Sequence, residues 1–417
     1  MRIAVLGAGV VGIATAWELL RDGHEVVVVD RRPEPAMETS FANAGMVAPG
    51  HAFVWSSPRA PKILLKALLR DDQSFRFRFQ ADPRFWRWCW QFLGQCTAAR
   101  AARNTTRKVE LCLYSQDRLH GVIAETGIRY GARTGGAVYL FRSAASFAAG
   151  VAHAKVLQDR GVRLEPLSPA EAAAVDPVYA TVTGRFAGAL FAPGDESGDA
   201  RLFTLGLAEC LRTRGVELRL NEPVTHWEVE RGRLLAVTTP LGRIAADAFV
   251  LAFGPYAAVE GRKLGLDLPI WPVKGYSVTI PIAGRNNPPT LSGVDEDNLF
   301  AFANFGDRVR LTAVAEFTGF DWSHRPEDFS GLLAAARELF PDAGDYDQPA
   351  YWAGLRPMTP DNLPRFGRGR LDNLWVNAGH GHMGWTWACG SARITADLIR
   401  GETPAIDVQP MLVGRTG

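Results

Sequence analysis

Arg356 stands in a sequence setting that suggests recognition of an anion. Residues 352–361 read WAGLRPMTPD, so this arginine lies among small and apolar residues and directly precedes Pro357. A proline restricts the preceding residue to extended conformations, which would aim the side chain steadily. A guanidinium pairs with a carboxylate through two parallel hydrogen bonds, an arrangement that lysine cannot reproduce. The alternative is a structural arginine that pairs with an acid such as Asp361.

The first thirty residues predict a strand–helix–strand unit that binds a dinucleotide. Two apolar strands flank a helix over residues 3–29, and three glycines at G-x-G-x-x-G spacing precede the helix: Gly7, Gly9 and Gly12. Such glycines allow a tight turn, close approach of the backbone to a pyrophosphate, and close helix packing. Asp30, 18 residues after Gly12, could accept a hydrogen bond from a ribose hydroxyl. An ordinary βαβ turn would leave this acid unexplained, but the motif alone does not separate NAD from FAD.

Two further segments bear on the choice of dinucleotide. Residues 38–50 (ETSFANAGMVAPG) are rich in small and hydroxyl side chains, a composition that lets backbone run close to a ligand. Residues 374–378 read as a strand, GHGHMGWT as a glycine-rich turn, and 388–399 as a helix. The positive end of this helix would stabilise negative charge on a reduced flavin ring. The alternative is a helix cap with incidental glycines.

Together these motifs resemble the flavin-dependent D-amino-acid oxidase superfamily, and more closely the small subunit of bacterial D-amino-acid dehydrogenases. The resemblance rests on GAGVVG, Asp30, TSFANAG and PG, and it extends over nearly the whole chain. It is carried further by GGAVYLFR, DESGDARLFT, LAFGPYA, PVKGYSVTIPIA, WAGLRPMTPD and NAGHGHMGWTWACGS. The resemblance implies FAD as a non-covalent cofactor. The residues expected to bind it are Gly7, Gly9, Val10, Val11, Gly12, Asp30, Arg31, Thr39, Ser40, Asn43, Ala44, Gly45, Val224, Gly254, Gly379, Gly381, His382, Met383, Gly384, Trp385 and Thr386.

The resemblance also implies the chemistry. Arg356 matches the arginine that holds the substrate carboxylate, so the Cα–H would lie over flavin N5 and leave as hydride. The imine would then hydrolyse to a 2-oxo acid and ammonia. Where relatives often have a tyrosine facing the flavin, Phe300 is the nearest match and Tyr276 a possible substitute. Lys274 and Arg310 could lie near the ring, although solvated or structural roles are the alternative.

His382 departs from the dehydrogenase pattern, which has a small residue at this position, and could alter redox behaviour or the choice of electron acceptor. The leading interpretation is a D-amino-acid dehydrogenase with a broad apolar preference that passes electrons to quinone. The same chemistry on D-proline, D-hydroxyproline or an N-substituted glycine, with quinone or oxygen as acceptor, is the near alternative. A nicotinamide-dependent dehydrogenase and a non-catalytic flavoprotein subunit are more distant ones. Stereochemistry and oligomeric state do not follow from the sequence.

The expected fold is α/β, with a discontinuous Rossmann-like FAD-binding domain and an α+β substrate domain whose sheet is mainly antiparallel. A chain of 417 residues is too long for one core. The FAD-binding signatures lie near both ends, so we assign residues 1–50, 198–262 and 353–417 to the first domain. Residues 51–197 and 263–352 then form the substrate domain.

Composition excludes several classes of protein. A net charge of +2 gives no indication of a nucleic-acid partner, and the five cysteines form no metal-ligand spacing. Their scatter favours a reducing compartment. Since the chain begins within a folded motif and lacks an 18-residue apolar run, we expect neither a signal peptide nor a spanning helix. A cytoplasmic location follows as an expectation.

Residues 61–95 interleave tryptophan and phenylalanine with arginine. This composition suits the interface of an anionic membrane, and the resembling dehydrogenases are peripheral membrane enzymes. We therefore expect a possible membrane-contact insert at the cytoplasmic face of a bacterial inner membrane. The alternative is an internally packed pair of aromatic helices.

Overall fold

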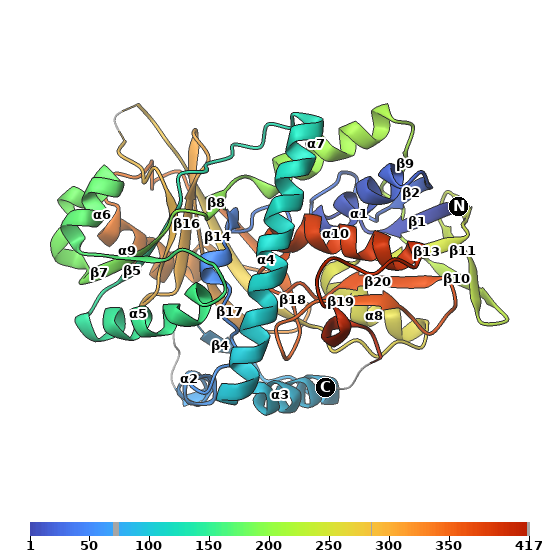
Figure 1. Cartoon of the computed structure of the whole chain (residues 1–417), viewed down its shortest axis with the longest axis horizontal. Helices are drawn as coiled ribbons and strands as arrows, with labels where there is room; N and C mark the ends of the chain where they lie inside the picture. The colour runs from blue at the N-terminus through green and yellow to red at the C-terminus, as the bar shows by residue number, and fades with distance from the viewer. Residues whose placement is uncertain (70–74, 285, 415–417) are drawn as a thin grey trace.

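The first of two large sheets is built on the strand–helix–strand unit at the start of the chain (Figure 1). In the part of the chain that the computed structural model describes, residues 1–69, 75–284 and 286–414, this sheet has six strands in the order β19-β20-β13-β1-β2-β9. They are β1 (Arg2–Leu6), β2 (Glu25–Val29), β9 (Glu217–Arg219), β13 (Ala248–Leu251), β19 (Arg365–Arg368) and β20 (Leu374–Ala378). All pair in parallel except β19, which is antiparallel to β20. Their continuous apolar runs reflect burial on both faces.

Helices cover one face of the first sheet and a small β-meander covers the other. The helices are α1 (Val10–Arg21), α7 (Ala200–Thr213) and α10 (Gly384–Arg400), which enclose a core around Trp17 and Phe203. The opposite face is covered by β10 (His226–Glu230), β11 (Arg233–Thr239), β12 (Gly242–Ala245) and α8 (Ala257–Lys263). This three-layer arrangement confirms the predicted α/β unit.

The second sheet is mainly antiparallel, as the alternating pattern of residues 263–352 predicts. Its order is β18-β14-β17-β16-β15-β5-β7-β6, and β4 also pairs with β17. The strands are β4 (Phe75–Phe77), β5 (Ala137–Phe141), β6 (Glu165–Leu167), β7 (Gly188–Ala192), β14 (Trp271–Pro281), β15 (Ser292–Asp295), β16 (Phe300–Asn304), β17 (Arg308–Phe317) and β18 (Ala350–Met358). Only the β5–β15 and β4–β17 pairs are parallel. Helices α6 (Pro169–Val175) and α9 (Ser330–Leu339) pack on one face, and α5 (Ala144–Gln158) on the other.

The strand that carries Arg356 belongs to the second sheet. It pairs with β14 so that Arg356 lies opposite Val273. The expected domain boundary at residue 353 therefore moves to the segment after β18, because backbone pairing with β14 outweighs proximity in sequence to the C-terminal FAD motif.

Helix α4 (Ala98–Thr126) links the two sheets. The side chain of Thr97 caps its first turn, and Gly127 ends it in the left-handed conformation with φ of 66°. Its C-terminal half packs in the core of the first sheet, while its middle contributes Cys112 to a cluster with Tyr139 of β5. Although α4 lies within the stretch expected to form the substrate domain, it also covers α10.

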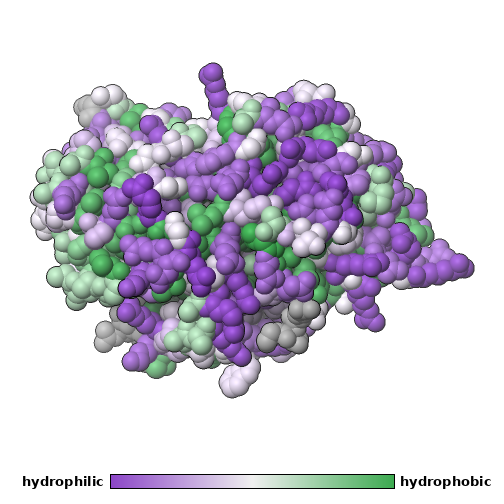
Figure 2. Space-filling view, in the orientation of Figure 1, coloured by the Kyte–Doolittle hydropathy of each residue, from purple (hydrophilic) through white to green (hydrophobic). Residues whose placement is uncertain are grey.

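Helices α2 (Ala60–Leu69) and α3 (Pro83–Gln95) lie together at the lower edge in Figure 1. In α3, the side chains of Phe85, Trp88 and Phe92 are buried, whereas Trp86 and Trp90 are exposed. Residues 70–74 of the expected 61–95 insert lie outside the described residues. The face of the molecule seen in Figure 2 is mostly hydrophilic. Among the described residues, no helix combines the length and apolar character that crossing a membrane requires.

The contact between α4 and α10 generates a stability prediction. A Cβ at Gly390 would lie 2.7 Å from Cβ and 2.8 Å from Cα of Ser115, so Gly390→Ala should destabilise the protein by about 1–3 kcal/mol. Gly121, within α4, has no neighbouring atom within 4 Å of such a Cβ, so Gly121→Ala should stabilise it by about 0.5–1 kcal/mol. Chemical denaturation of both variants measures these changes. A Gly390→Ala protein as stable as the wild type would contradict the close packing of α4 on α10.

Candidate functional site

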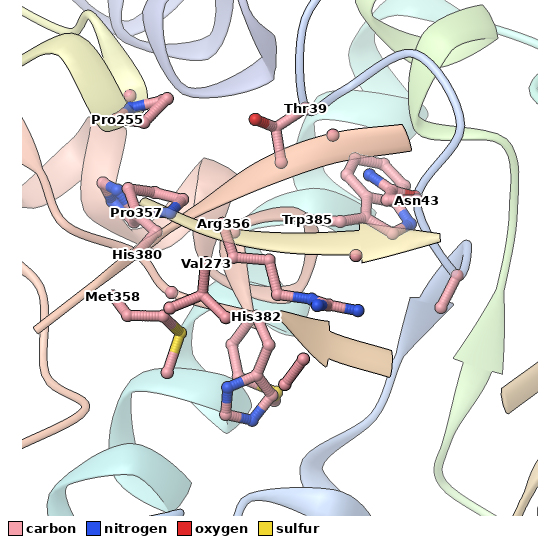
Figure 3. Close-up of a pocket in the computed structure, with 18 of the residues that line it drawn as sticks. Thr39, Asn43, Pro255, Val273, Arg356, Pro357, Met358, His380, His382 and Trp385 are labelled. Atoms are coloured by element: carbon pink, nitrogen blue, oxygen red, sulfur yellow. The ribbon is translucent and has the colours of Figure 1, made fainter. Parts of the chain in front are cut away.

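A cavity of about 710 Å³ extends from the first sheet to the second. At one end it is lined by the glycine-rich turn after β1, and at the other by Arg356 and Val273 from adjacent strands of the second sheet (Figure 3). It thus begins at the carboxyl ends of parallel strands, where nucleotides bind in α/β folds.

The glycine-rich turn is shaped by backbone contacts. Gly7 has φ of 119°, and a Cβ there would lie 2.5 Å from the carbonyl oxygen of Ala252. A Cβ at Gly12 would lie 1.9 Å from the carbonyl oxygen of Gly7. Gly12 therefore allows α1 to pack against the turn, and it does not line the cavity. The N-cap residue of α1, Gly9, provides no side-chain hydrogen bond, which favours an anion at this helix end.

Asp30 organises the turn and borders the cavity. Its Oδ2 accepts a hydrogen bond from the Ala8 N–H at 2.6 Å, and its Oδ1 accepts one from the Arg32 N–H at 2.8 Å. Burial raises the pKa of Asp30, while these two donors act in the opposite direction. Since each carboxylate oxygen has two lone-pair sites, Asp30 can still accept from a ribose hydroxyl.

The segment 38–50 connects the nucleotide end of the cavity to the second sheet. Ser40 Oγ accepts from the Val10 N–H at 3.0 Å, and Thr39 Oγ1 donates to the Leu355 carbonyl at 2.7 Å. The Asn43 side chain accepts from the Gly45 N–H at 2.9 Å, which holds the tight turn. The Thr39 contact therefore ties the expected cofactor loop to the residue before Arg356.

Several polar atoms along the cavity wall lack a hydrogen-bond partner within the described ranges. These buried atoms are Ser277 Oγ, Asn377 Oδ1, His380 Nε2 and Trp385 Nε1. Burial lowers the pKa of His380 to about 3, so its imidazole is neutral. Because buried polar groups are normally paired, these atoms fit a bound ligand with its own donors and acceptors. The N-terminus of α10 likewise has no side-chain cap. The wall thus suits the polar edge of a flavin.

Arg356 is a cation without an acidic partner among the described residues. Its Nη1 donates to the carbonyl oxygens of Val314 at 2.8 Å and Lys274 at 3.4 Å. Asp361, the alternative partner considered from the sequence, instead pairs with Arg365 at 2.9 Å. Burial lowers the pKa of Arg356 to about 10, which reflects the absence of a nearby carboxylate. The accessible atoms of this side chain border the cavity.

Gly275 makes room for the guanidinium. A Cβ at this position would lie 2.4 Å from Cζ of Arg356 and equally close to both terminal nitrogens. Any side chain at residue 275 would therefore displace the cation. The guanidinium carbon lies 5.9 Å from the Trp55 ring centroid, and the cavity lining also includes the aromatic side chains of Phe75, Trp88, Phe92 and Phe317.

Most residues expected to bind the cofactor line this cavity, although their contacts with the cofactor stay a prediction. They are Gly7, Gly9, Val10, Val11, Asp30, Arg31, Thr39, Ser40, Asn43, Ala44, Gly45, Val224, Gly254, Gly381, His382, Met383, Gly384, Trp385 and Thr386. Gly379 lies outside the lining, and its φ of 79° serves the turn after β20.

The prediction that Phe300 faces the cofactor cavity is wrong. Its side chain is 1% exposed and belongs to the apolar core of the second sheet. Ala301 lines the cavity instead, because neighbouring strand residues point to opposite faces, and Leu299 reaches it from the turn before β16. Tyr276 does line the cavity, but its hydroxyl donates to the Glu316 carboxylate. The Tyr276 hydroxyl is therefore already engaged by the protein and is not free to take the place of the missing tyrosine hydroxyl.

The two other cations considered for the ring have structural roles. Lys274 Nζ lies 3.5 Å from a carboxylate oxygen of Glu316, and Arg310 lies 3.3 Å from Asp199. Within the described ranges, no cluster of three His, Cys, Asp or Glu side chains could hold a metal ion.

Sequence reasoning missed several lining residues. His380 lies inside the recognised GHGHMG stretch, so its position in that motif could have identified it. Trp55, His51 and Phe75 carry no comparable local signal, since packing of the substrate-side segments brings them to the cavity. Glu222 also borders it, held by Arg219 and Thr239.

Comparison with known proteins agrees with this geometry. The model of the DAO family, described as FAD dependent oxidoreductase, matches residues 2–398. The chain is 43% identical over 415 residues to D-amino acid dehydrogenase 2 of Mesorhizobium japonicum, covering 99% of this chain and 100% of that relative. It is 42% identical to the D-amino acid dehydrogenase of Paramagnetospirillum magneticum, covering 100% of this chain and 99% of the relative.

Solved structures support the fold. Glycine oxidase from Geobacillus kaustophilus superimposes with a TM-score of 0.74 at 24% identity, covering 100% of this chain and 99% of that protein. Iminodiacetate oxidase from Chelativorans superimposes with a TM-score of 0.74 at 20% identity, covering 99% of each chain. At these identities the likeness concerns the arrangement of the two sheets.

The unpaired indole at the cavity wall generates a cofactor-binding prediction. Trp385→Phe removes an N–H donor that lacks a protein partner, so the Kd for FAD should rise about 5- to 30-fold, for ~1–2 kcal/mol. The smaller ring also leaves a cavity in the core around Phe203, so the stability of the apoprotein is compared with that of a control variant. Trp17→Phe is the matched control: Trp17 Nε1 is also buried and unpaired within the described ranges, but Trp17 lies outside the cavity lining. Reconstitution of apoprotein with FAD measures both affinities, and equal affinities for the two variants would contradict the role of Trp385.

Proposed function

The chain belongs to the DAO family of FAD-dependent oxidoreductases, and on that premise we propose that it oxidises D-amino acids to 2-oxo acids and ammonia. The observation that carries the proposal is the Arg356 guanidinium, which borders the cavity without an acidic partner among the described residues. The two curated relatives reported above are both named D-amino acid dehydrogenases. Every amino acid substrate brings the carboxylate that this cation lacks.

The residues along the cavity suit FAD in an extended pose. Asp30 would accept from the ribose, and the N-terminus of α1 would face the pyrophosphate. Asn377, His380 and Trp385 would meet the ring system. When bound there, FAD supplies a two-electron acceptor for the hydride of the substrate Cα.

Arg356 would bind the substrate carboxylate through a pair of parallel hydrogen bonds. Backbone carbonyls already hold one of its nitrogens, so little side-chain entropy is lost when the substrate binds. Pairing also relieves the cost of leaving a buried cation without a counter-ion. The aromatic wall around Trp55 and Trp88 excludes water and favours an apolar substrate side chain.

Replacement of Arg356 tests the proposal. Arg356→Lys retains the charge but loses the bidentate geometry, so KM should rise about 10- to 150-fold, corresponding to ~1.5–3 kcal/mol. The FAD content should be unchanged. Arg365→Lys provides the control, because Arg365 pairs with Asp361 outside the cavity lining.

Anaerobic flavin reduction by a panel of D-, L- and cyclic amino acids, including D-proline and sarcosine, defines the substrate class. An unchanged KM in Arg356→Lys would refute the carboxylate role. Reduction by cyclic or N-substituted amines alone would replace D-amino acids with those substrates.

We also propose that quinone accepts the electrons and that α2 and α3 contact the membrane surface. The side chains of Trp90 and Leu65 are 79% and 59% exposed. Arg84 and Arg87 lie on the same helix as Trp90 with exposed side chains, which pair with Asp82 and Asp267 and would exchange these partners for anionic headgroups. Exposed tryptophan next to arginine suits the interfacial region of a bilayer.

Co-sedimentation with anionic vesicles tests the contact. Trp86→Ser combined with Trp90→Ser should reduce the bound fraction at least several-fold, because both exposed indoles are lost. Leu241→Ser removes a 72% exposed side chain from the β11–β12 turn and should leave binding unchanged. Equal sedimentation of the wild type and the tryptophan variant would rule out this surface.

A further inference from the structure

Lys108 is a buried lysine next to the functional cavity. Its side chain is 0% exposed and projects from the middle of α4. Nζ donates to the Phe53 carbonyl at 2.7 Å and lies 3.4 Å from His382 Nε2. Across the described ranges, no carboxylate lies within ion-pair distance of this amine. Burial lowers the pKa of Lys108 to about 7, so the neutral amine is well populated at physiological pH.

His382 connects Lys108 to the cavity. Its imidazole lines the cavity wall and stacks on Trp55, with ring centroids 4.8 Å apart and an angle of 17° between the planes. One ring nitrogen, Nε2, faces Lys108. The other, Nδ1, has no hydrogen bond to any described residue. Figure 3 shows the side chains of His382 and Arg356 among the residues that line the cavity.

We propose that His382 and Lys108 together accept the proton that the substrate ammonium group must lose before oxidation. The inference rests on the proposed function and assigns a role that the cofactor and Arg356 do not fill. An ammonium nitrogen has no lone pair, so it cannot form the C=N bond as hydride leaves Cα. A group near the substrate nitrogen therefore has to accept a proton first.

The step balances without any further reactant. An N–H bond of the ammonium breaks, its electron pair stays on nitrogen, and the proton binds His382 Nδ1. The proton on Nε2 then moves to the lone pair of neutral Lys108. The imidazole returns to its neutral form with the opposite tautomer, and the charge rests on Lys108. This order requires the neutral amine of Lys108 to accept from Nε2 in the resting protein.

The geometry allows the substrate to reach both groups. The Arg356 guanidinium carbon lies 5.9 Å from the Trp55 ring centroid, and Trp55 is also the ring on which His382 stacks. A carboxylate, Cα and amine, with a hydrogen bond at each end, span about 9 Å. A substrate that lies across Trp55 can thus contact Arg356 with its carboxylate and His382 with its nitrogen.

The charges around the pair set the direction of proton movement. Burial lowers the pKa of His382 well below its usual value, and the charges of Lys108, His51 and Arg356 add to this effect. Although burial opposes it, Glu296 raises the pKa of His51, and these two groups pair at 3.0 Å.

Cys112 faces Lys108 from the same helix. Asp195 lies outside the cavity lining and accepts a hydrogen bond from the Tyr139 hydroxyl, and burial raises its pKa to about 7. Lys108 is thus the more basic member of the pair, and a substrate carboxylate on Arg356 would make both members more basic.

The pH dependence of anaerobic flavin reduction tests the inference. In the wild type, the rate at saturating substrate should rise through an apparent pKa near 7 as Lys108 loses its proton. In His382→Gln and Lys108→Met, this rise should move at least two pH units higher, toward the pKa of the substrate ammonium. The rate at pH 7 should fall about 100-fold and recover at high pH. The double variant should resemble either single one, because the residues act as a unit.

Lys108→Met is expected to fold, because it replaces a buried amine that lacks a carboxylate partner with an apolar side chain of similar length. Lys155→Met, on the exposed side of α5, is the control and should retain the wild-type profile. A purely structural role for the pair would lower the rate equally at every pH, and that result would overturn the inference.

A second measurement does not depend on turnover. NMR titration of the imidazole in the holoenzyme should show His382 neutral to well below pH 6.5, and Lys108→Met should raise its pKa because a neighbouring positive charge is removed. An unmoved titration would contradict the coupling. Failure of every amine to reduce the wild-type flavin would overturn the proposed function and this inference with it. Reduction with an unshifted pH profile in the variants would overturn the inference alone.

Discussion

The unpaired charge of Arg356 is the constraint around which the functional end of the cavity is organised. A buried guanidinium is costly unless hydrogen bonds and a counter-ion compensate, and in the described structure only two backbone carbonyls contribute. Its place depends on the pairing of β18 with β14, on the open space above Gly275, and on the apolar wall that keeps water out. The carboxylate of a bound ligand would supply the counter-ion that the described residues do not provide for Arg356.

The cofactor end follows the same physical principle with different groups. The N-termini of α1 and α10 border one cavity, and buried polar atoms without partners in the described residues belong to side chains that line it. These groups do not form hydrogen bonds with one another, because each donor or acceptor is held in place by its own helix or strand. A ligand that runs from the glycine-rich turn to the second sheet can satisfy both ends. The hydrogen bond from Thr39 to the Leu355 carbonyl connects the cofactor loop to the strand that carries Arg356.

Helix α4 joins two roles that appear unrelated in the sequence. Its contact with α10 through Ser115 and Gly390 sets the distance between these two helices. The same helix brings Lys108 against His382, two residues separated by 274 positions. Close packing of the two helices therefore positions both the α10 end and the amine behind it.

Local sequence determined the units that satisfy their own requirements within a few residues. The turn from Gly7 to Gly12, the acid at Asp30 and the extended backbone before Pro357 follow from steric rules and short-range hydrogen bonds, so each was recognisable in isolation. Tertiary structure decided which face of β16 meets the cavity, so Phe300 entered the core while Ala301 became a lining residue. It also decided the sheet to which Arg356 belongs and the approach of Lys108 to the cavity. Those outcomes depend on strand pairing and helix packing between distant segments, and such contacts have no signature within the segments themselves.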